Sequence, residues 1–302
     1  MRFASLTVGL VAVASLLSPA TGSPMPKSSS SKADSINYTC AYRNGYQMIG
    51  YLNTRMAKDG DSYCRAEQDN GYVGGIIRFT VQYGSALAVV EKYMEDENYK
   101  EEFKDVYEEL KKRAAAQSTV TDGFDDFCVA WKKAATNGNS FFDAQMAVAR
   151  NMYEIPALNM AKRFKLRFKY PLTRFAVTQF AITGGIGEDD RTIGGIMKAT
   201  NAKITADVTG ESNSQLTVGT FKVDEIEWLK LFMDKASDAA GAYYAPVVKV
   251  LNDLITKGNY NIGSTTRFKG FDGKTVTLQC TKLKATQPKP TVKTDEETST
   301  KV

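Results

Sequence analysis

The sequence predicts a mainly α-helical (α+β) domain with room for two lobes and a small β element near its C-terminal end. Apolar residues recur at intervals of three and four through most of the chain, which is the spacing of one helix face. Alternation of apolar and polar residues, typical of a strand, is visible only around Asp272 and Gly273. No internal repeat divides the chain into similar modules.

The two ends of the chain predict segments outside the fold. Residues 1–22 combine Arg2, an apolar run from Leu6 to Leu17 and small residues before Ser23, a pattern typical of a secretory signal peptide. Residues 23–35 and 285–302 are polar and contain prolines, which predicts disordered arms. We therefore expect a secreted, extracellular domain at residues 36–284. We expect no membrane segment, because no apolar run reaches the ~20 residues that span a bilayer.

Helical spacing predicts a series of helices in the first half of that domain. Leu87, Val90 and Met94 lie on one face, and the next segment has acidic residues early and basic residues late, as the helix dipole favours. Ser140, three residues before Asp143, predicts an N-terminal cap. The predicted segments are 83–97, 99–113, 124–131 and 140–152.

The second half continues the helical pattern and ends in strands. Pro156 suits the first turn of a helix, and the glycines after residue 183 end a later one. Apolar stripes predict helices over 156–168, 171–183, 192–200, 223–233 and 245–255. The stretch 265–280 predicts a β-hairpin, because alternating residues flank Asp272-Gly273.

Composition excludes several classes of site. The chain has 0 histidines, which excludes Ser-His-Asp and Cys-His catalysis, histidine-ligated zinc and haem with a proximal histidine. Neither a phosphate-binding Gly-x-x-x-x-Gly-Lys loop nor a strand followed by Gly-x-Gly-x-x-Gly occurs. We therefore expect no cofactor and no metal. The kinds of function that remain are catalysis by carboxylates and binding without catalysis.

The net charge of +5 is small for 302 residues and gives no electrostatic prediction. The basic run from Lys162 to Lys169 alternates in spacing, which spreads its charges around a helix. A solvated face is therefore favoured over a nucleic-acid interface, and no nucleic-acid partner is expected.

The cysteines predict two disulfides. An even number of cysteines in an exported chain favours paired thiols, and their wide spacing does not suit zinc. Four thiols allow three pairings, of which the bridge between Cys40 and Cys64, the nearest in sequence, is the favoured one.

Several segments, in order, resemble one known family. They are "GYVGGIIRFT" at 71–80, "AWKKAATNGNSFFDAQMAVARNMYEIPALNMA" at 130–161, "QFAITGGIG" at 179–187 and "VLNDLITKGNYNIG" at 250–263. Over most of Tyr63 to Gly263 the chain is similar to the chitosanases of glycoside hydrolase family 46. The resemblance implies a lysozyme-like helical fold with two lobes and a cleft. It also implies inverting endo-hydrolysis of chitosan, a β-1,4-linked glucosamine polymer, and we expect a monomer whose partner is that polysaccharide or a related one.

Inverting hydrolysis needs a carboxylic acid and a carboxylate base about 6.5–9.5 Å apart. The family's base is an Asp in a loop that follows Tyr-Cys, and the resemblance places Asp69 at that position. The alternative for Asp69 is a plain turn residue, because Asp-Asn-Gly is a common turn. The family's acid, a Glu further toward the N-terminus, falls on Leu52 or Asn53, and neither side chain can protonate a leaving oxygen.

Other matched positions also differ from the family. Asn70 replaces an arginine that orients the base, Val73 replaces a threonine that positions water, and Ser85 replaces an aspartate that holds a sugar amine. The remaining candidates for a substitute acid are Asp59, Asp61 and Glu67. These changes together favour loss or change of the ancestral activity.

Seven residues are candidate substrate contacts: Tyr63, Asn70, Gly71, Tyr72, Arg150, Glu188 and Asp189. For each of the two tyrosines, the alternatives are stacking on a sugar and packing in the core. Arg150 orients a carboxylate or forms an internal ion pair. Glu188 and Asp189 line an acidic subsite or form a solvated loop.

Three functions follow from this pattern. The first is a secreted chitosanase with Asp69 as the base. The second is a catalytically impaired carbohydrate-binding or effector protein that keeps the family's cleft. The third is an interaction protein whose cleft binds something other than chitosan, because a polycation prefers an acidic groove and this chain is not acidic overall.

Overall fold

A computed structural model describes residues 40–56, 60–137, 139–204, 215–241 and 244–280, all within one compact unit. The predicted signal peptide at 1–22, the arm at 23–35 and the tail at 285–302 lie outside these residues, as does Asp59. Among the described helices, none has the length and apolar content needed to cross a membrane.

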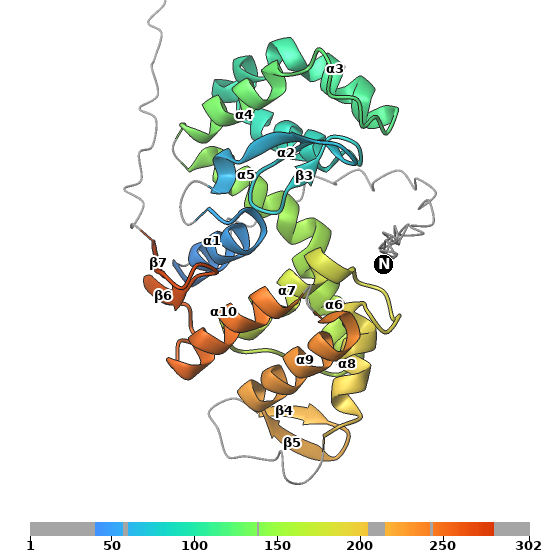
Figure 1. Cartoon of the computed structure of the whole chain (residues 1–302), viewed down its shortest axis with the longest axis vertical. Helices are drawn as coiled ribbons and strands as arrows, with labels where there is room; N and C mark the ends of the chain where they lie inside the picture. The colour runs from blue at the N-terminus through green and yellow to red at the C-terminus, as the bar shows by residue number, and fades with distance from the viewer. Residues whose placement is uncertain (1–39, 57–59, 138, 205–214, 242–243, 281–302) are drawn as a thin grey trace, which may run out of the picture. The chain divides into compact units, whose positions relative to one another are not determined.

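Helices dominate the described part of the chain, as the sequence predicts (Figure 1). A π-helical turn, η3, joins α5 directly to α6, and short 3₁₀ segments precede β1 and α3. The α-helices are α1 (Cys40–Thr54), α2 (Ser85–Met94), α3 (Lys104–Ala115), α4 (Asp126–Ala135), α5 (Ser140–Ala149), α6 (Ile155–Arg163), α7 (Pro171–Gly184), α8 (Ile193–Asn201), α9 (Glu225–Ala240) and α10 (Ala245–Thr256). The short segments are η1 (Gly60–Ser62), η2 (Glu97–Glu102) and η3 (Arg150–Glu154).

Local chemistry explains several helix starts. Prolines occupy the first turns of α7 and α10, where the missing N–H has no intrahelical partner in any case. Pro156 also stands in the first turn of α6, directly after the π-helical turn. Asp224 caps α9 by accepting hydrogen bonds from the backbone N–H groups of Ile226 and Glu227. The predicted cap at Ser140 is wrong: α5 begins there without a side-chain cap, and the Ser140 hydroxyl instead hydrogen-bonds the Tyr99 hydroxyl at 2.9 Å.

The stretch from 62 to 80 contains strands that the sequence did not predict. β1 (Cys64–Glu67), β2 (Gly71–Gly74) and β3 (Phe79–Thr80) form an antiparallel sheet in the order β1-β2-β3, and Glu67 faces Gly71 across its first turn. A second hairpin, β4 (Gln215–Val218) with β5 (Phe221–Asp224), takes Val223 out of the predicted helix. The late hairpin is confirmed as β6 (Thr265–Lys269) with β7 (Thr275–Gln279).

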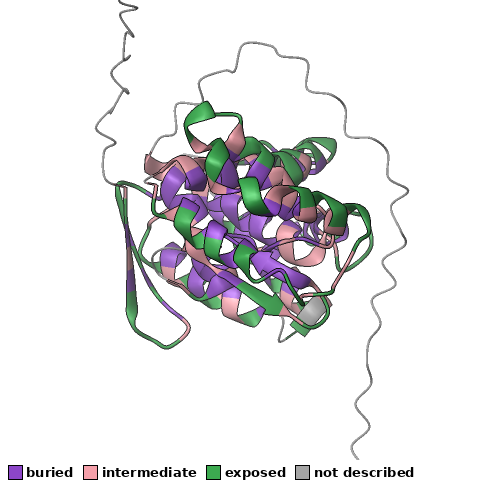
Figure 2. Ribbon diagram, turned by 90° about the horizontal axis from the view of Figure 1, so that it is seen from above, coloured by how far each residue is buried: buried purple, intermediate pink, exposed green. Residues whose placement is uncertain are grey.

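Apolar side chains from most of these elements form one continuous core, and the buried stretches lie in the middle of the ribbon in Figure 2. Trp131 of α4 is fully buried and packs edge-on against Phe141 at 4.8 Å between ring centroids. Trp228 of α9 is equally buried and stacks on Phe232 at 5.2 Å. Helix α1 packs against α7, where the Tyr46 and Phe175 rings meet at 5.4 Å. The wall of the candidate site is therefore anchored in this core through α1 and α7.

The favoured disulfide between Cys40 and Cys64 is wrong. Cys40 bonds Cys280, and Cys64 bonds Cys128. Cys40 opens a helix of 15 residues, which at ~1.5 Å per residue carries the chain about 20 Å away before β1 begins. Cys64 instead lies over α4, which supplies Cys128. Helix α1 thus holds Cys40 and Cys64 apart, although they are the nearest cysteines in sequence.

Candidate active-site pocket

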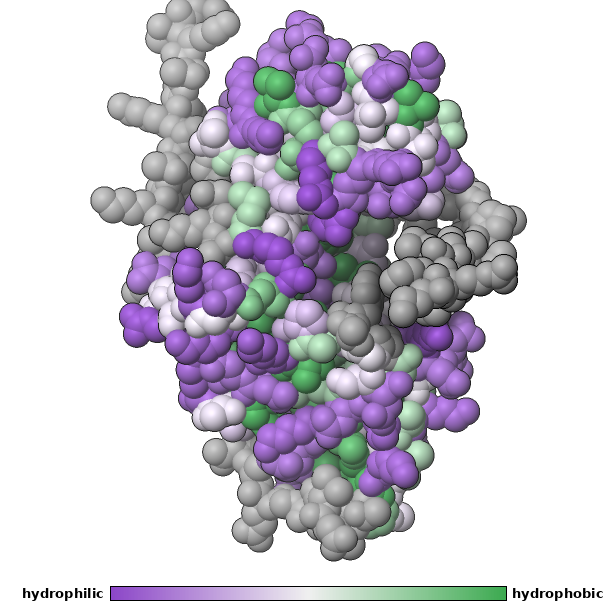
Figure 3. Space-filling model, viewed as in Figure 1, coloured by the Kyte–Doolittle hydropathy of each residue, from purple (hydrophilic) through white to green (hydrophobic). Residues whose placement is uncertain are grey.

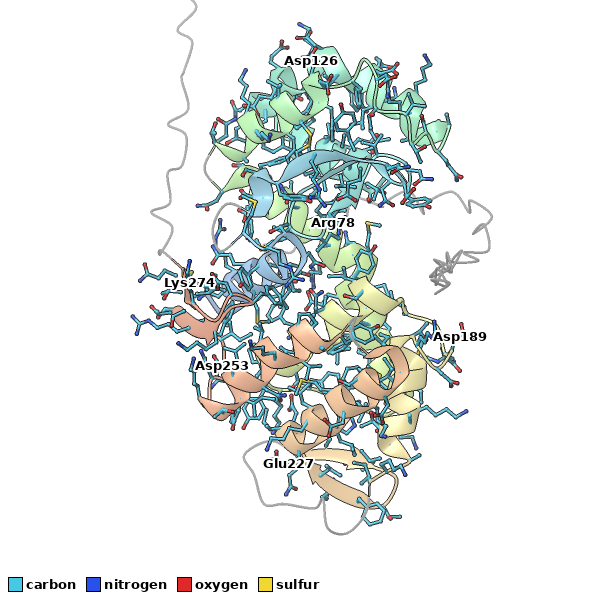
Figure 4. All side chains as sticks on the ribbon, in the orientation of Figure 1. Arg78, Asp126, Asp189, Glu227, Asp253 and Lys274 are labelled. Atoms are coloured by element: carbon cyan, nitrogen blue, oxygen red, sulfur yellow. A yellow bond between two sulfur atoms is a disulfide. The ribbon has the colours of Figure 1, made fainter. Side chains whose placement is uncertain are left out.

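A small pocket lies where α1, the β1–β3 sheet and α7 meet. It has a volume of about 210 Å³ and is lined by Asn53, Asn70, Val73, Ile77, Arg78, Thr80, Ile182 and Thr183. Figure 4 shows Arg78 between the region of α2 to α5 and the region of α1 and α7. The molecular surface is hollowed in the middle of this face (Figure 3). The pocket is smaller than the ~300–1,000 Å³ that encloses a whole drug-sized ligand, so it suits one unit of a longer chain.

Asn53 lines this pocket from α1 and belongs to a closed set of amide hydrogen bonds. Its Nδ2 donates to the Ile49 carbonyl at 2.8 Å and to Gln179 Oε1 at 3.0 Å. Gln179, which is 2% exposed, donates back to Asn53 Oδ1 at 3.3 Å and to Thr183 Oγ1 at 3.0 Å. The side-chain amides of Asn53 on α1 and Gln179 on α7 thus hydrogen-bond each other, and both are neutral.

Two residues of the pocket lining, Arg78 and Asn70, belong to an ion-pair cluster around Glu67. Arg78 forms two very short hydrogen bonds to the carboxylate, Arg65 Nε donates to it at 2.9 Å, and Asn70 Nδ2 donates to it at 3.2 Å. Burial raises the pKa of Glu67, but the bonds from Arg65 and Arg78 outweigh burial and hold it below its usual value. Glu67 is therefore ionised at neutral pH and cannot donate a proton as a general acid.

Arg78 has an unusual backbone. Its φ of +59° lies in the left-handed region, which disfavours residues with a Cβ by about 1–2 kcal/mol. Its N–H donates to the Gly75 carbonyl at 3.0 Å, so a tight turn fixes this conformation. The side chain is 38% exposed and reaches Glu67 from the pocket side. The turn thus places a guanidinium at the pocket wall.

Comparison with models of known protein families identifies the family. The model of "Glycosyl hydrolase family 46" matches residues 61–243. This chain belongs to that family.

Solved chitosanase structures share the fold. Native chitosanase from Bacillus subtilis MY002 matches with a TM-score of 0.58 and 23% identity, covering 79% of this chain and 98% of that chain. A mutant of that chitosanase complexed with 6 GlcN has a TM-score of 0.58, 25% identity and the same two coverages. The Gynuella sunshinyii GH46 chitosanase complexed with chitotetraose has a TM-score of 0.58 and 21% identity, covering 80% of this chain and 98% of that chain. A comparison with curated proteins found no match. The predicted helical, lysozyme-like fold of this chitosanase-like glycoside hydrolase is therefore confirmed.

Among the described residues that line the pocket, none is a carboxylic acid. Asn53, one of the two residues at which the sequence resemblance places the family's acid, lines the pocket from α1. Asp69 lies in the exposed turn between β1 and β2, next to Asn70, which does line the pocket. The assignment of Asp69 as a base stays a prediction. Of the substitute acids, Asp61 lies in η1, where its backbone carbonyl accepts hydrogen bonds from Trp131 and Gln145.

The candidate contacts on the hairpin occupy different environments. Tyr72 is 3% exposed, packs edge-on against Phe124 and Phe127, and donates a hydrogen bond to Asp125 at 2.5 Å. Burial and that hydrogen bond raise the pKa of Tyr72 to about 12. Its ring therefore has no face for sugar, and the core alternative explains its position. Tyr63 is half-buried under the Arg65 guanidinium, which lies 5.5 Å from its ring centroid. Gly71 is buried against Ser118 and Thr119 at a φ of +66°.

The other candidate contacts lie outside the pocket lining. Arg150 is half-buried in η3 near Tyr42. Glu188 is exposed and forms an ion pair with Arg163 at 2.5 Å. Asp189 is exposed on the loop before α8, away from Arg78 (Figure 4). The run of basic residues from Lys162 to Lys169 is also exposed, although α6 ends at Arg163 and does not carry all of it.

Sequence reasoning missed the residues that complete the pocket. Arg78 and Thr80 follow the glycines of the sheet, and Ile182 and Thr183 lie at the end of α7. All four stand in the segments 71–80 and 179–187 that carry the family resemblance, but nothing in those segments marked them as neighbours. The close approach of the sheet to α1 and α7 brings these four residues together. On the side of α5, Gly75 allows the sheet to pack closely, because a Cβ there would lie 2.3 Å from Gln145 Oε1.

Proposed function

We propose that this chain is a saccharide-binding member of the chitosanase family. Its pocket holds a unit of a β-1,4-linked amino-sugar polysaccharide, and hydrolysis of that polymer is at most a residual activity. The observation that carries this proposal is the pocket lining, which offers amides, hydroxyls and one guanidinium among its described residues. An inverting mechanism needs an acid and a base on opposite faces of the sugar.

The polysaccharide class comes from the family. The solved relatives include complexes with 6 GlcN and with chitotetraose, and this chain shares their fold over most of its length. Amide and hydroxyl groups suit hydrogen bonding to sugar hydroxyls, and the three branched apolar residues Val73, Ile77 and Ile182 suit the apolar faces of a pyranose ring.

We also propose that the protein acts outside the cell as a monomer. The signal-like sequence of residues 1–22 and two disulfides between residues distant in sequence support export to an oxidising compartment. Secretion is tested by recovery of a chain lacking residues 1–22 from the medium, and the monomer by light scattering.

The central experiment separates binding from hydrolysis. Purified protein is incubated with chitosan, and reducing ends are measured alongside affinity electrophoresis in chitosan gels. We expect retardation in the gel and no release of reducing ends above the buffer blank. Release that disappears in the Asp69→Asn variant would establish the chain as an active chitosanase. Absence of both retardation and release would remove the proposal.

Hydrolysis by Asp69 is the second candidate function. The position of Asp69 supports it, because this exposed carboxylate is the direct neighbour of the pocket residue Asn70. A base in that turn requires a partner acid. The Asp69→Asn comparison tests this candidate directly, because it changes a charge in an exposed turn without removing any hydrogen bond described above.

A further inference from the structure

The charge and shape of the pocket also indicate which amino sugar it holds, an inference that rests on the proposed function. Glucosamine units carry an ammonium group below neutral pH, whereas N-acetylglucosamine units carry a neutral acetamido group with one N–H, one carbonyl and one methyl. The two ligands therefore ask for opposite pocket chemistry. An ammonium requires carboxylates, and an acetamido group requires an amide-like donor and acceptor beside an apolar patch.

The pocket lining carries one positive charge, on Arg78, and no carboxylate among its described residues. Glu67 is hydrogen-bonded to two lining residues, Arg78 and Asn70, and also accepts a bond from Arg65. Asp69 lies in the exposed turn beside Asn70 but is not part of the lining. An ammonium group placed against Arg78 faces a like charge, and the Glu67 carboxylate is already engaged.

The same wall offers what an acetamido group needs. Asn70 uses its Nδ2 to bond Glu67, and its Oδ1 makes no hydrogen bond within the described part of the chain, so it can accept a sugar N–H. Arg78 bonds Glu67 through Nη2, which leaves Nη1 as a donor for a carbonyl oxygen. Val73, Ile77 and Ile182 line the same cavity and supply apolar contact for a methyl group.

We propose that this pocket selects N-acetylated, chitin-type units over protonated glucosamine units. Arg78 is the residue that sets this preference, by donating to the acetamido carbonyl and repelling the ammonium. Asn53 and Gln179 do not compensate, because their amides are neutral and bonded to each other.

The test compares two hexasaccharides of β-1,4-linked units, one fully N-acetylated and one fully deacetylated, by isothermal titration calorimetry. At about pH 5, where the amines are protonated, we expect the acetylated hexamer to bind at least about tenfold more tightly, which equals about 1.4 kcal/mol. At about pH 8, where more amines are neutral, we expect this gap to narrow. A fully acidic hexasaccharide of uronic acid units serves as a third ligand.

Variants of Arg78 assign the cause. Arg78→Gln keeps a donor and removes the charge, so it should raise affinity for the deacetylated hexamer several-fold and change affinity for the acetylated one less. Arg267→Gln removes the same charge from an exposed position on β6, outside the pocket lining, and should change neither affinity.

The outcomes separate the preference for acetylated units from the proposed saccharide binding. Equal or tighter binding of the deacetylated hexamer overturns the preference and leaves the proposed function intact. Tighter binding of the acidic hexasaccharide overturns it as well, by assigning Arg78 to a carboxylate. If no hexasaccharide binds, both the preference and the proposed function fail.

Discussion

Replacing Arg78 by alanine and by glycine separates two opposing effects at one position. Both variants lose the hydrogen bonds to Glu67, whose side chain is 11% exposed. A hydrogen bond to a charged group contributes about 1.5–3 kcal/mol. Arg78 is 38% exposed and Arg65 stays in place, so solvent screening reduces the loss to about 1 kcal/mol.

The two variants differ in backbone strain. Alanine keeps a Cβ at a φ of +59°, whereas glycine adopts this region freely, which is worth about 1 kcal/mol. We therefore expect Arg78→Ala to unfold about 1 kcal/mol more easily than the unmodified protein, and Arg78→Gly to be close to it. The measurement is urea unfolding at neutral pH, with variants compared by midpoint at a common slope.

The neighbouring arginine provides the control. Arg65 also bonds Glu67 but lies within β1, outside the residues with positive φ. Glycine in a strand is less stable than alanine by about 0.5–1 kcal/mol, so the order of the two variants should reverse at Arg65. If alanine proves as stable as glycine at Arg78, the turn does not hold Arg78 in a strained conformation and this account of its placement is wrong.

Three further predictions concern the frame around the pocket. In urea unfolding, Gly75→Ala should destabilise the fold by several kcal/mol more than Gly84→Ala. Both glycines have a positive φ, but of the two only Gly75 has a neighbour that a Cβ would meet, an amide oxygen at 2.3 Å. Similar losses of stability in the two variants would show that the sheet can move. Non-reducing peptide mapping should find Cys64 linked to Cys128. Replacing both cysteines by serine should lower the free energy of unfolding by about 2–4 kcal/mol. A map that links either of them to another cysteine would contradict the fold. Because the pKa of Glu67 is lowered from 4.5 in the folded state, its ion pairs stabilise the fold above pH 4.5 and this contribution is lost as the pH falls below that value. Glu67→Gln should therefore flatten the acid side of the stability curve, and an unchanged curve would argue against the ion-pair cluster.

The helices were predictable because their burial follows the sequence period. In α2, Val90 of the predicted stripe is buried in the core, whereas Leu87 and Met94 are only partly buried against it. Helix α9 starts where Asp224 can cap it. Helix α1 was not predicted, although Tyr46 and Ile49 are fully buried in the core, because its buried face also includes Arg43 and Asn44 at 8% and 0% exposure. These polar residues interrupt the apolar pattern in the sequence, and they find long-range partners, such as Asp143 in an ion pair with Arg43 at 3.0 Å.

The sheet beside the pocket was missed for a different reason. Residues of β2 are buried on both sides, so they show no alternation, and glycines occupy positions where other parts of the chain approach. A Cβ at Gly74 would lie 2.8 Å from the Trp131 ring, which comes from a helix distant in sequence. A run of glycines can form a loop open to a ligand or a place where another part of the chain packs closely, and Gly74 and Gly75 leave room for Trp131 and Gln145. Local sequence cannot distinguish these two uses of glycine.

The substitution Asn53→Asp tests whether adding one carboxyl group to the pocket is enough to give hydrolysis. In Asn53→Asp, a carboxyl group would face the Ile49 carbonyl, which now accepts a hydrogen bond from Nδ2 at 2.8 Å. An oxygen acceptor at that distance favours the protonated acid, so the pKa of the new carboxyl should rise above the ordinary aspartate value of about 3.9. A raised pKa is what a general acid requires.

We nevertheless expect Asn53→Asp to release no reducing ends from chitosan. Among the described residues that line the pocket with Asn53, none is a carboxylate that could activate water, and an acid alone does not complete an inverting pair. Asn53→Ser, which removes the amide without adding an acid, is the control for altered binding. Hydrolysis by the aspartate variant, and its loss on adding Asp69→Asn, would show that the base persists at Asp69 and that the protein is one substitution away from a working enzyme.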